Sequence, residues 1–167
     1  MERRLFALDH NFPEPLLQGL ASSIPDAELV PIRLIDATFA DLDDWELLLA
    51  LRGHVRPWDG LITNDDAMLS LPKELVVLQQ TQLTLVVAKG EGHNPVRAVG
   101  VLLCHLAHVC RHTTRERAQV WNFRVTQKNY EAPDLYLDKV AMKTKTTAKA
   151  LFERHKVAKK ELRDRGK

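Results

Sequence analysis

The sequence predicts an α/β fold, with a central, mostly parallel sheet of about five strands, helices on both faces, and a basic helical extension at the C-terminus. Short apolar runs rich in β-branched residues alternate with longer segments of helical periodicity. The run at residues 83–88 is apolar without a break, as strands are when both faces of a parallel sheet are covered. A lysine-rich segment without a clear apolar face follows the last run.

The strands are predicted from short runs of high β-propensity that end at turn residues or acids. The third of them follows a Pro-Trp-Asp-Gly turn, and the last one precedes the lysine-rich segment. Strands are predicted within residues 4–8, 28–35, 56–65, 83–88 and 119–125.

Helices are predicted between these strands. The segment after the first strand carries Pro13 and Pro15 in its first turn, where proline is tolerated, and then leucines at helical spacing. Asp41 is predicted to cap a helix in which Asp44 stands three residues further on, as in a capping box. A further helix begins near residue 67, and residues 96–112 form a long, almost entirely apolar one after a glycine-rich loop.

Length and composition fit one compact domain over residues 1–125 and an extension over residues 126–167. The chain has 167 residues, of which 45% are apolar, and no uncharged apolar run of the length a membrane span needs. The apolar stretch before Asp9 is too short for a secretory signal. We therefore expect a soluble, cytoplasmic protein without a membrane segment.

The charge is unevenly distributed along the chain. Residues 124–167 hold 13 Lys and Arg against 6 Asp and Glu, which leaves 11 against 16 in the rest. An acidic body with a basic tail is typical of an enzyme that must also bind a polyanion. The alternative interpretation of the tail is a solvated helical extension.

Three aspartates mark the candidate site. Asp9 and Asp65 follow predicted strands, and Asp44 lies at the start of a helix. In open parallel sheets, ligands bind at the carboxyl ends of the strands where the strand order reverses. Carboxylates gathered there repel one another unless a cation joins them, which predicts a Mg²⁺ or Mn²⁺ site. Taken singly, each acid has an alternative role as a helix cap.

The long helix at residues 96–112 contains two cysteines and three histidines of interest. Cys104 and Cys110 point in different directions around a helix, so the thiols are predicted to stay reduced. His105, His108 and His112 share one face at a spacing that zinc sites use. The core-like flanking residues favour instead a partly buried helix whose histidines meet polar groups or a partner.

The order of these motifs resembles the PIN domain nucleases, in particular the short bacterial PIN-like proteins of toxin type, over roughly residues 4–125. That family shows Asp-x-Asn-x-Pro after its first strand, an Asp opening the helix before its third strand, and Thr-x-Asp-x-Asp-Phe after that strand. In the third motif Asp66 stands one place early, Ala67 takes the place of the second acid, and Met68 replaces the aromatic. The matching residues are Asp9, Asn11, Pro13, Asp44, Thr63 and Asp65.

The resemblance implies a three-layer PIN-like sandwich, metal-dependent cleavage of single-stranded RNA and a role as the toxin of a toxin–antitoxin pair. It implies Mg²⁺ or Mn²⁺ as cofactor, RNA, an antitoxin and a second copy of the chain as partners, and Asp9, Asp44 and Asp65 as catalytic and metal-binding acids. Asp66 is a further metal-ligand candidate. Supporting groups would be Asn11, Thr63, Glu91 and Asn94, and RNA-binding groups would be Lys89, Arg97, Lys139, Lys143 and Lys145.

Two other functional classes remain open from the sequence. One is a PIN-like module that has lost catalysis and acts by binding RNA or a protein partner. The other is a phosphotransfer enzyme of the haloacid dehalogenase or receiver type, because Asp9, Thr63 and Lys89 hold similar places. Dehalogenases need a second Asp where this chain has Asn11, which weighs against that class.

Overall fold

The computed structural model describes residues 3–13, 15, 24–90, 94–124, 138 and 140–155. The chain divides into two compact units, Met1–Thr126 and Gln127–Lys167. The sheet and the helices that cover it belong to the first unit, and α7 (Ala148–His155) belongs to the second. None of the helices in the described residues is long and apolar enough to cross a membrane.

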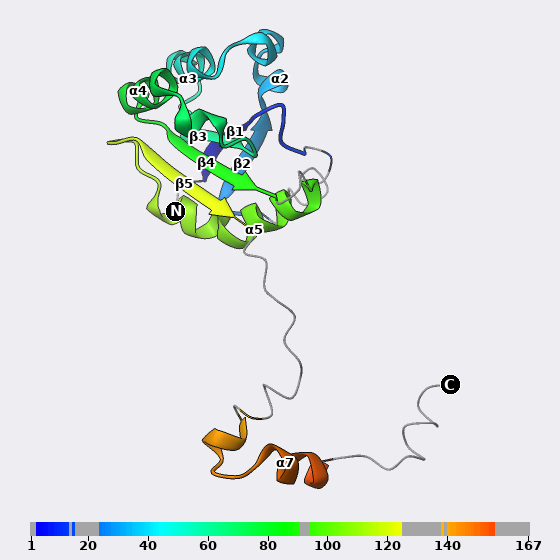
Figure 1. Cartoon of the computed structure of the whole chain (residues 1–167). Coiled ribbons are helices and arrows are strands. Elements are labelled where there is room, and N and C mark those ends of the chain that lie inside the picture. Colours follow the sequence, from blue (N-terminus) through cyan, green and yellow to red (C-terminus); the bar gives the residue numbers. More distant parts are fainter. Residues whose placement is uncertain are drawn as a thin grey trace. The chain divides into compact units, whose positions relative to one another are not determined.

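A five-stranded, fully parallel sheet forms the centre of the first unit, which confirms the predicted α/β class (Figure 1). Its strands lie in the order β2-β1-β3-β4-β5. The chain runs outward from β1 to β2 and then crosses back to β3 on the other side of β1, so the strand order reverses between β1 and β3. The strands are β1 (Arg4–Leu8), β2 (Ala27–Pro31), β3 (Gly60–Thr63), β4 (Thr84–Lys89) and β5 (Gln119–Arg124).

Helices cover both faces of this sheet, giving three layers. α3 and α4 lie on one face and α5 on the other (Figure 1). Leu48 and Leu61 belong to the core on the α3/α4 side, and Ile62 and Leu102 belong to the core on the α5 side. The helical segments are α2 (Ile32–Ile35), η2 (Ala37–Asp41), α3 (Asp44–Gly53), η3 (Ala67–Ser70), α4 (Pro72–Thr81) and α5 (Pro95–His112).

The predicted strand over residues 28–35 is only half correct. β2 ends at Pro31, and the β-branched residues after it form α2. Pro31 is the N-cap residue of α2 and has no N–H to donate to a neighbouring strand. The strand therefore ends at this proline. The chain therefore leaves the sheet earlier than β-propensity suggested.

The predicted cap of α3 is also wrong. Asp41 ends η2, and Asp43 is the capping residue, whose backbone N–H donates to Glu46 Oε2 at 3.1 Å. Asp44 is therefore the first residue of the helix and not the third. The predicted helix after β1 lies mostly outside the described residues, although Pro15 is helical.

Candidate active site

Asp9 is held at the point where the strand order reverses. Leu8 pairs with Ile62, and the Asp9 N–H donates to the Ile62 carbonyl at 2.9 Å, which sets Asp9 level with Thr63. The hydroxyl of Thr63, a predicted supporting group, donates to Asp9 Oδ2 at 2.8 Å. His10 Nδ1 lies 2.8 Å from Asp9 Oδ1. Each oxygen of the Asp9 carboxylate thus has a polar contact that fixes its position. Asp9 is only 5% exposed.

Asp65 is tied to Asp9 through the same hydroxyl. The Asp65 N–H donates to Thr63 Oγ1 at 3.0 Å, so Thr63 connects the ends of β1 and β3. The Ala67 N–H donates to Asp65 Oδ1 at 2.9 Å, although the N-cap residue of η3 is Asp66 and not Asp65. This hydrogen bond uses one carboxylate oxygen, so it is compatible with a second role for Asp65.

Asp44 joins these two acids from the N-terminus of α3. Burial raises the pKa of its carboxyl group above the ordinary value, and the charges of Asp9, Asp65 and Glu74 raise this pKa further, against a smaller lowering by His10. A carboxylate that senses two others in this way lies within their electrostatic range. The fold thus places Asp9 and Asp65 within electrostatic range of Asp44.

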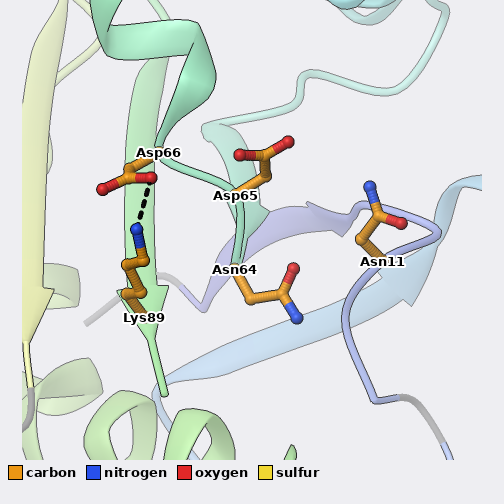
Figure 2. Close-up of a pocket in the computed structure, with 5 residues that line it drawn as sticks. All are labelled: Asn11, Asn64, Asp65, Asp66 and Lys89. Atoms are coloured by element: carbon orange, nitrogen blue, oxygen red, sulfur yellow. Dashed lines mark hydrogen bonds and ion pairs between the residues drawn. The ribbon is translucent and has the colours of Figure 1, made fainter. Parts of the chain in front are cut away.

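An open cleft of about 290 Å³ lies beside this cluster. Figure 2 shows the Asp66 and Lys89 pair on one side of the cleft, Asn11 on the other, and Asn64 and Asp65 between them. Lys89 Nζ lies 2.7 Å from Asp66 Oδ1. Lys89, which the sequence proposed as an RNA-binding residue, therefore lines the cleft, where it is paired with one of the predicted metal ligands.

The donor chemistry of Asp9, Asp44 and Asp65 suits a hard divalent cation, which prefers carboxylate oxygens. Within the ranges that the structure describes, no group of three or more His, Cys, Asp or Glu side chains is placed closely enough to hold a metal ion. A cation bound jointly by Asp9, Asp44 and Asp65, or by Asp66, therefore stays a prediction.

Other predicted residues lie outside the cleft lining. Asn94 caps α5, because its side-chain oxygen accepts from the Arg97 N–H at 3.1 Å. Lys143 and Lys145 are exposed in the second unit. Glu91 and Lys139 lie outside the described residues.

Three residues at this site were not predicted from the sequence. His10 contacts Asp9, Asn64 lines the cleft, and Glu74 raises the pKa of Asp44. His10 and Asn64 are sequence neighbours of predicted site residues, which was an available signal. Glu74 is placed by packing of α4 against α3, which local sequence does not reveal.

The histidine face of α5 packs on the edge strand β5. The ring of His105 stacks on Phe123 at a centroid distance of 4.3 Å, and His108 meets Trp121 edge-on at 5.3 Å. This agrees with a packing role and gives the zinc interpretation no support in the described residues. Cys104 and Cys110 are both free thiols, as predicted, and burial raises the pKa of Cys110 to about 11.

In chemical terms, two acids, two amides and a lysine line the open cleft, and one of these acids, Asp65, lies within electrostatic range of Asp44. Acids of this kind can hold a cation, and amide and ammonium groups can donate to phosphate oxygens. Comparisons with protein-family models, with curated proteins and with solved structures find no match for this chain.

Proposed function

We propose that the protein is a PIN-like endoribonuclease that cleaves single-stranded RNA with Mg²⁺ or Mn²⁺. The observation that carries the proposal is the link between Asp9 and Asp65 at the reversal of strand order, where Thr63 Oγ1 hydrogen-bonds to both residues. Burial and then the charges of these two acids raise the pKa of the Asp44 carboxyl group, which lies within their electrostatic range. Acids placed to repel one another are stabilised when a cation binds among them.

The residues of the chain have separable roles in this proposal. Asp9, Asp44 and Asp65 would hold the cation, and Thr63 would fix the relative positions of Asp9 and Asp65 through its two hydrogen bonds. A bound divalent cation supplies a water of lowered pKa and neutralises charge on the phosphate. Asn11 and Lys89, both in the cleft lining, would donate to phosphate oxygens of the RNA.

The charge distribution supports RNA as the polyanion. The acidic first part of the chain needs cationic groups elsewhere to hold a phosphate backbone, and the basic C-terminal segment supplies them. Lys143 and Lys145, exposed in the second unit, are candidates, together with Arg97 and Lys139. We retain a toxin role, with an antitoxin and a second copy of the chain as partners, as part of the proposal.

A nuclease assay on a labelled single-stranded RNA tests the proposal. We expect cleavage with Mg²⁺ or Mn²⁺, loss of cleavage with EDTA, and loss of cleavage in Asp65→Asn. Asp41→Asn is the matched control, because it makes the same change in charge at an exposed residue of η2. Cleavage that persists in EDTA, or that falls equally in both variants, would contradict the assignment.

A binding module without catalysis is the second candidate. Its support is that both oxygens of Asp9 already contact protein groups and that Asp66 is paired with Lys89. This candidate predicts RNA binding that does not depend on divalent cations, and intact RNA after incubation with either metal. The same assay, run with a binding measurement, separates the two functions.

A further inference from the structure

A second cavity adjoins the acidic cleft, and the proposed chemistry does not use it. Its volume is about 430 Å³, and its walls include Phe12, Ile32 and Ala40. This size lies within the range of pockets that bind small organic groups, which are mostly apolar with a few polar groups for orientation. His10, Asn11 and Arg33 are the polar members of its lining.

Two residues connect this cavity to the acids. Asn11 lines both the cavity and the acidic cleft. His10 lines the cavity, and its Nδ1 lies 2.8 Å from Asp9 Oδ1. A ligand that entered the cavity would therefore reach to the edge of the carboxylate cluster.

The residues that line the cavity favour binding of a flat group with apolar faces and a polar edge. A phosphate gains nothing from walls such as Phe12 and Ile32, whereas a nucleobase buries its faces against apolar atoms. Proteins that read single-stranded RNA take splayed bases against imidazole or guanidinium planes and hydrogen-bond their edges with amides. His10, Arg33 and Asn11 are side chains of these three kinds.

We propose that this cavity binds one nucleobase of the single-stranded RNA, next to the phosphate that enters the acidic cleft. The inference rests on the proposed ribonuclease function and adds a base subsite to it. The cavity thereby sets which nucleotide stands beside the cleavage position. Ala40 and Arg33, both exposed, come from η2 and α2, the segment that the sequence analysis placed partly in a strand.

The test uses the full chain with Asp65→Asn, which stops cleavage, and a short labelled RNA in which a single abasic nucleotide is moved along the strand. We expect one abasic position to weaken binding by about tenfold, the usual contribution of one stacked base. Ala40→Phe, which fills the cavity, should lower the affinity for intact RNA by the same factor and remove the sensitivity at that position. Ala37→Phe is the control, because Ala37 is an exposed residue of the same η2 helix and does not line the cavity.

Arg33→Gln provides a second variant at the cavity rim. It should weaken the binding of intact RNA and reduce the loss of affinity caused by the abasic nucleotide at the same position. Uniform sensitivity along the strand, or unchanged affinity and profile in Ala40→Phe, would overturn the base subsite. In that case, EDTA-sensitive cleavage by the chain with Asp65 intact would leave the ribonuclease proposal standing. A chain that neither binds nor cleaves RNA overturns both proposals.

Discussion

Two aspartates are buried at opposite ends of the sheet, and the protein stabilises them in different ways. Asp59, only 1% exposed, precedes β3 and accepts from the Leu5 N–H at 2.8 Å, from Arg4 at 3.1 Å and from Arg115 at 2.9 Å. Asp9, 5% exposed, follows β1 and contacts a hydroxyl and an imidazole. One carboxylate has two guanidinium partners, and the other lies near two further acids.

The difference separates a structural acid, Asp59, from Asp9, which we propose binds a ligand. At the amino end, Arg4 and Arg115 neutralise Asp59 within the fold, and Arg4 also donates to the Thr113 carbonyl at 2.6 Å, so this network ties the start of β1 to the end of α5. At the carboxyl end, burial and then the charges of Asp9, Asp65 and Glu74 raise the pKa of Asp44 instead. Ligands of parallel sheets bind at the carboxyl end, where this charge is left to be neutralised.

Removal of the structural carboxylate should have the largest effect on folding. We expect Asp59→Asn to lower the free energy of unfolding by about 2–4 kcal/mol, because it breaks a buried ion pair and leaves two arginines without their acid. Urea denaturation followed by circular dichroism measures this. Asp41→Asn, the exposed control, should stay within about 0.5 kcal/mol of the parent. A loss below about 1 kcal/mol for Asp59→Asn would mean that the network is not a stabilising one.

The same substitution at the other end should scarcely affect folding. In Asp9→Asn, the amide oxygen can still accept from Thr63, and the amide nitrogen can donate to the His10 imidazole, so we expect a change within about 1 kcal/mol in metal-free buffer. Cleavage should nevertheless fall by about a hundredfold or more, because a proposed metal ligand is lost. A large fall in melting temperature would make Asp9 a second structural acid and remove the contrast with Asp59.

Asp44→Asn should reveal the repulsion at the carboxyl end through its pH dependence. The folded-state pKa of Asp44 is raised above the ordinary 3.8, so the folded protein binds this proton more tightly than the unfolded chain does. Ionisation of Asp44 therefore destabilises the fold as the pH rises through the interval from 3.8 to the raised value. We expect Asp44→Asn to be more stable than the parent at pH 7, with a difference that shrinks toward zero below pH 4. Thermal melts across this pH range measure the difference, and a variant that is less stable at pH 7 would contradict it.

The sheet could be predicted from the sequence because each strand carries its own signal. The apolar run that forms β4 can bury its side chains only if both faces of the sheet are covered. The errors arose where two signals competed. β-Propensity continues past Pro31, although the backbone leaves the sheet there. Three aspartates near the start of α3 have the sequence pattern of a helix cap, and only the contact with Glu46 identifies Asp43 as the cap.

The site could be predicted only in part, for a different reason. The three acids could be proposed because each was predicted at an element end, but local sequence does not show which strand ends lie next to each other. The strand order brings Thr63 beside Asp9, and the end of β4 brings Lys89 to Asp66. The second cavity depends on α2 and η2. The sequence predicted a strand where α2 lies and no helix at η2, so the lining could not be assembled beforehand.

Substitutions in the Asp66 and Lys89 ion pair should have the smallest effect on folding. Their effects on RNA binding and cleavage should distinguish two functions of the pair. Both side chains are partly exposed, at 26% and 42%, so either Asp66→Asn or Lys89→Met should change stability by less than about 1 kcal/mol. If Lys89 contacts RNA, Lys89→Met should weaken binding and reduce the salt slope by about 0.7. Asp66→Asn should then strengthen binding, because it removes the carboxylate that competes with phosphate for Lys89. Binding titrations at several salt concentrations test these opposite signs. Weaker Mn²⁺-dependent cleavage in Asp66→Asn, without tighter RNA binding, would instead make Asp66 a metal ligand, as the sequence analysis predicted.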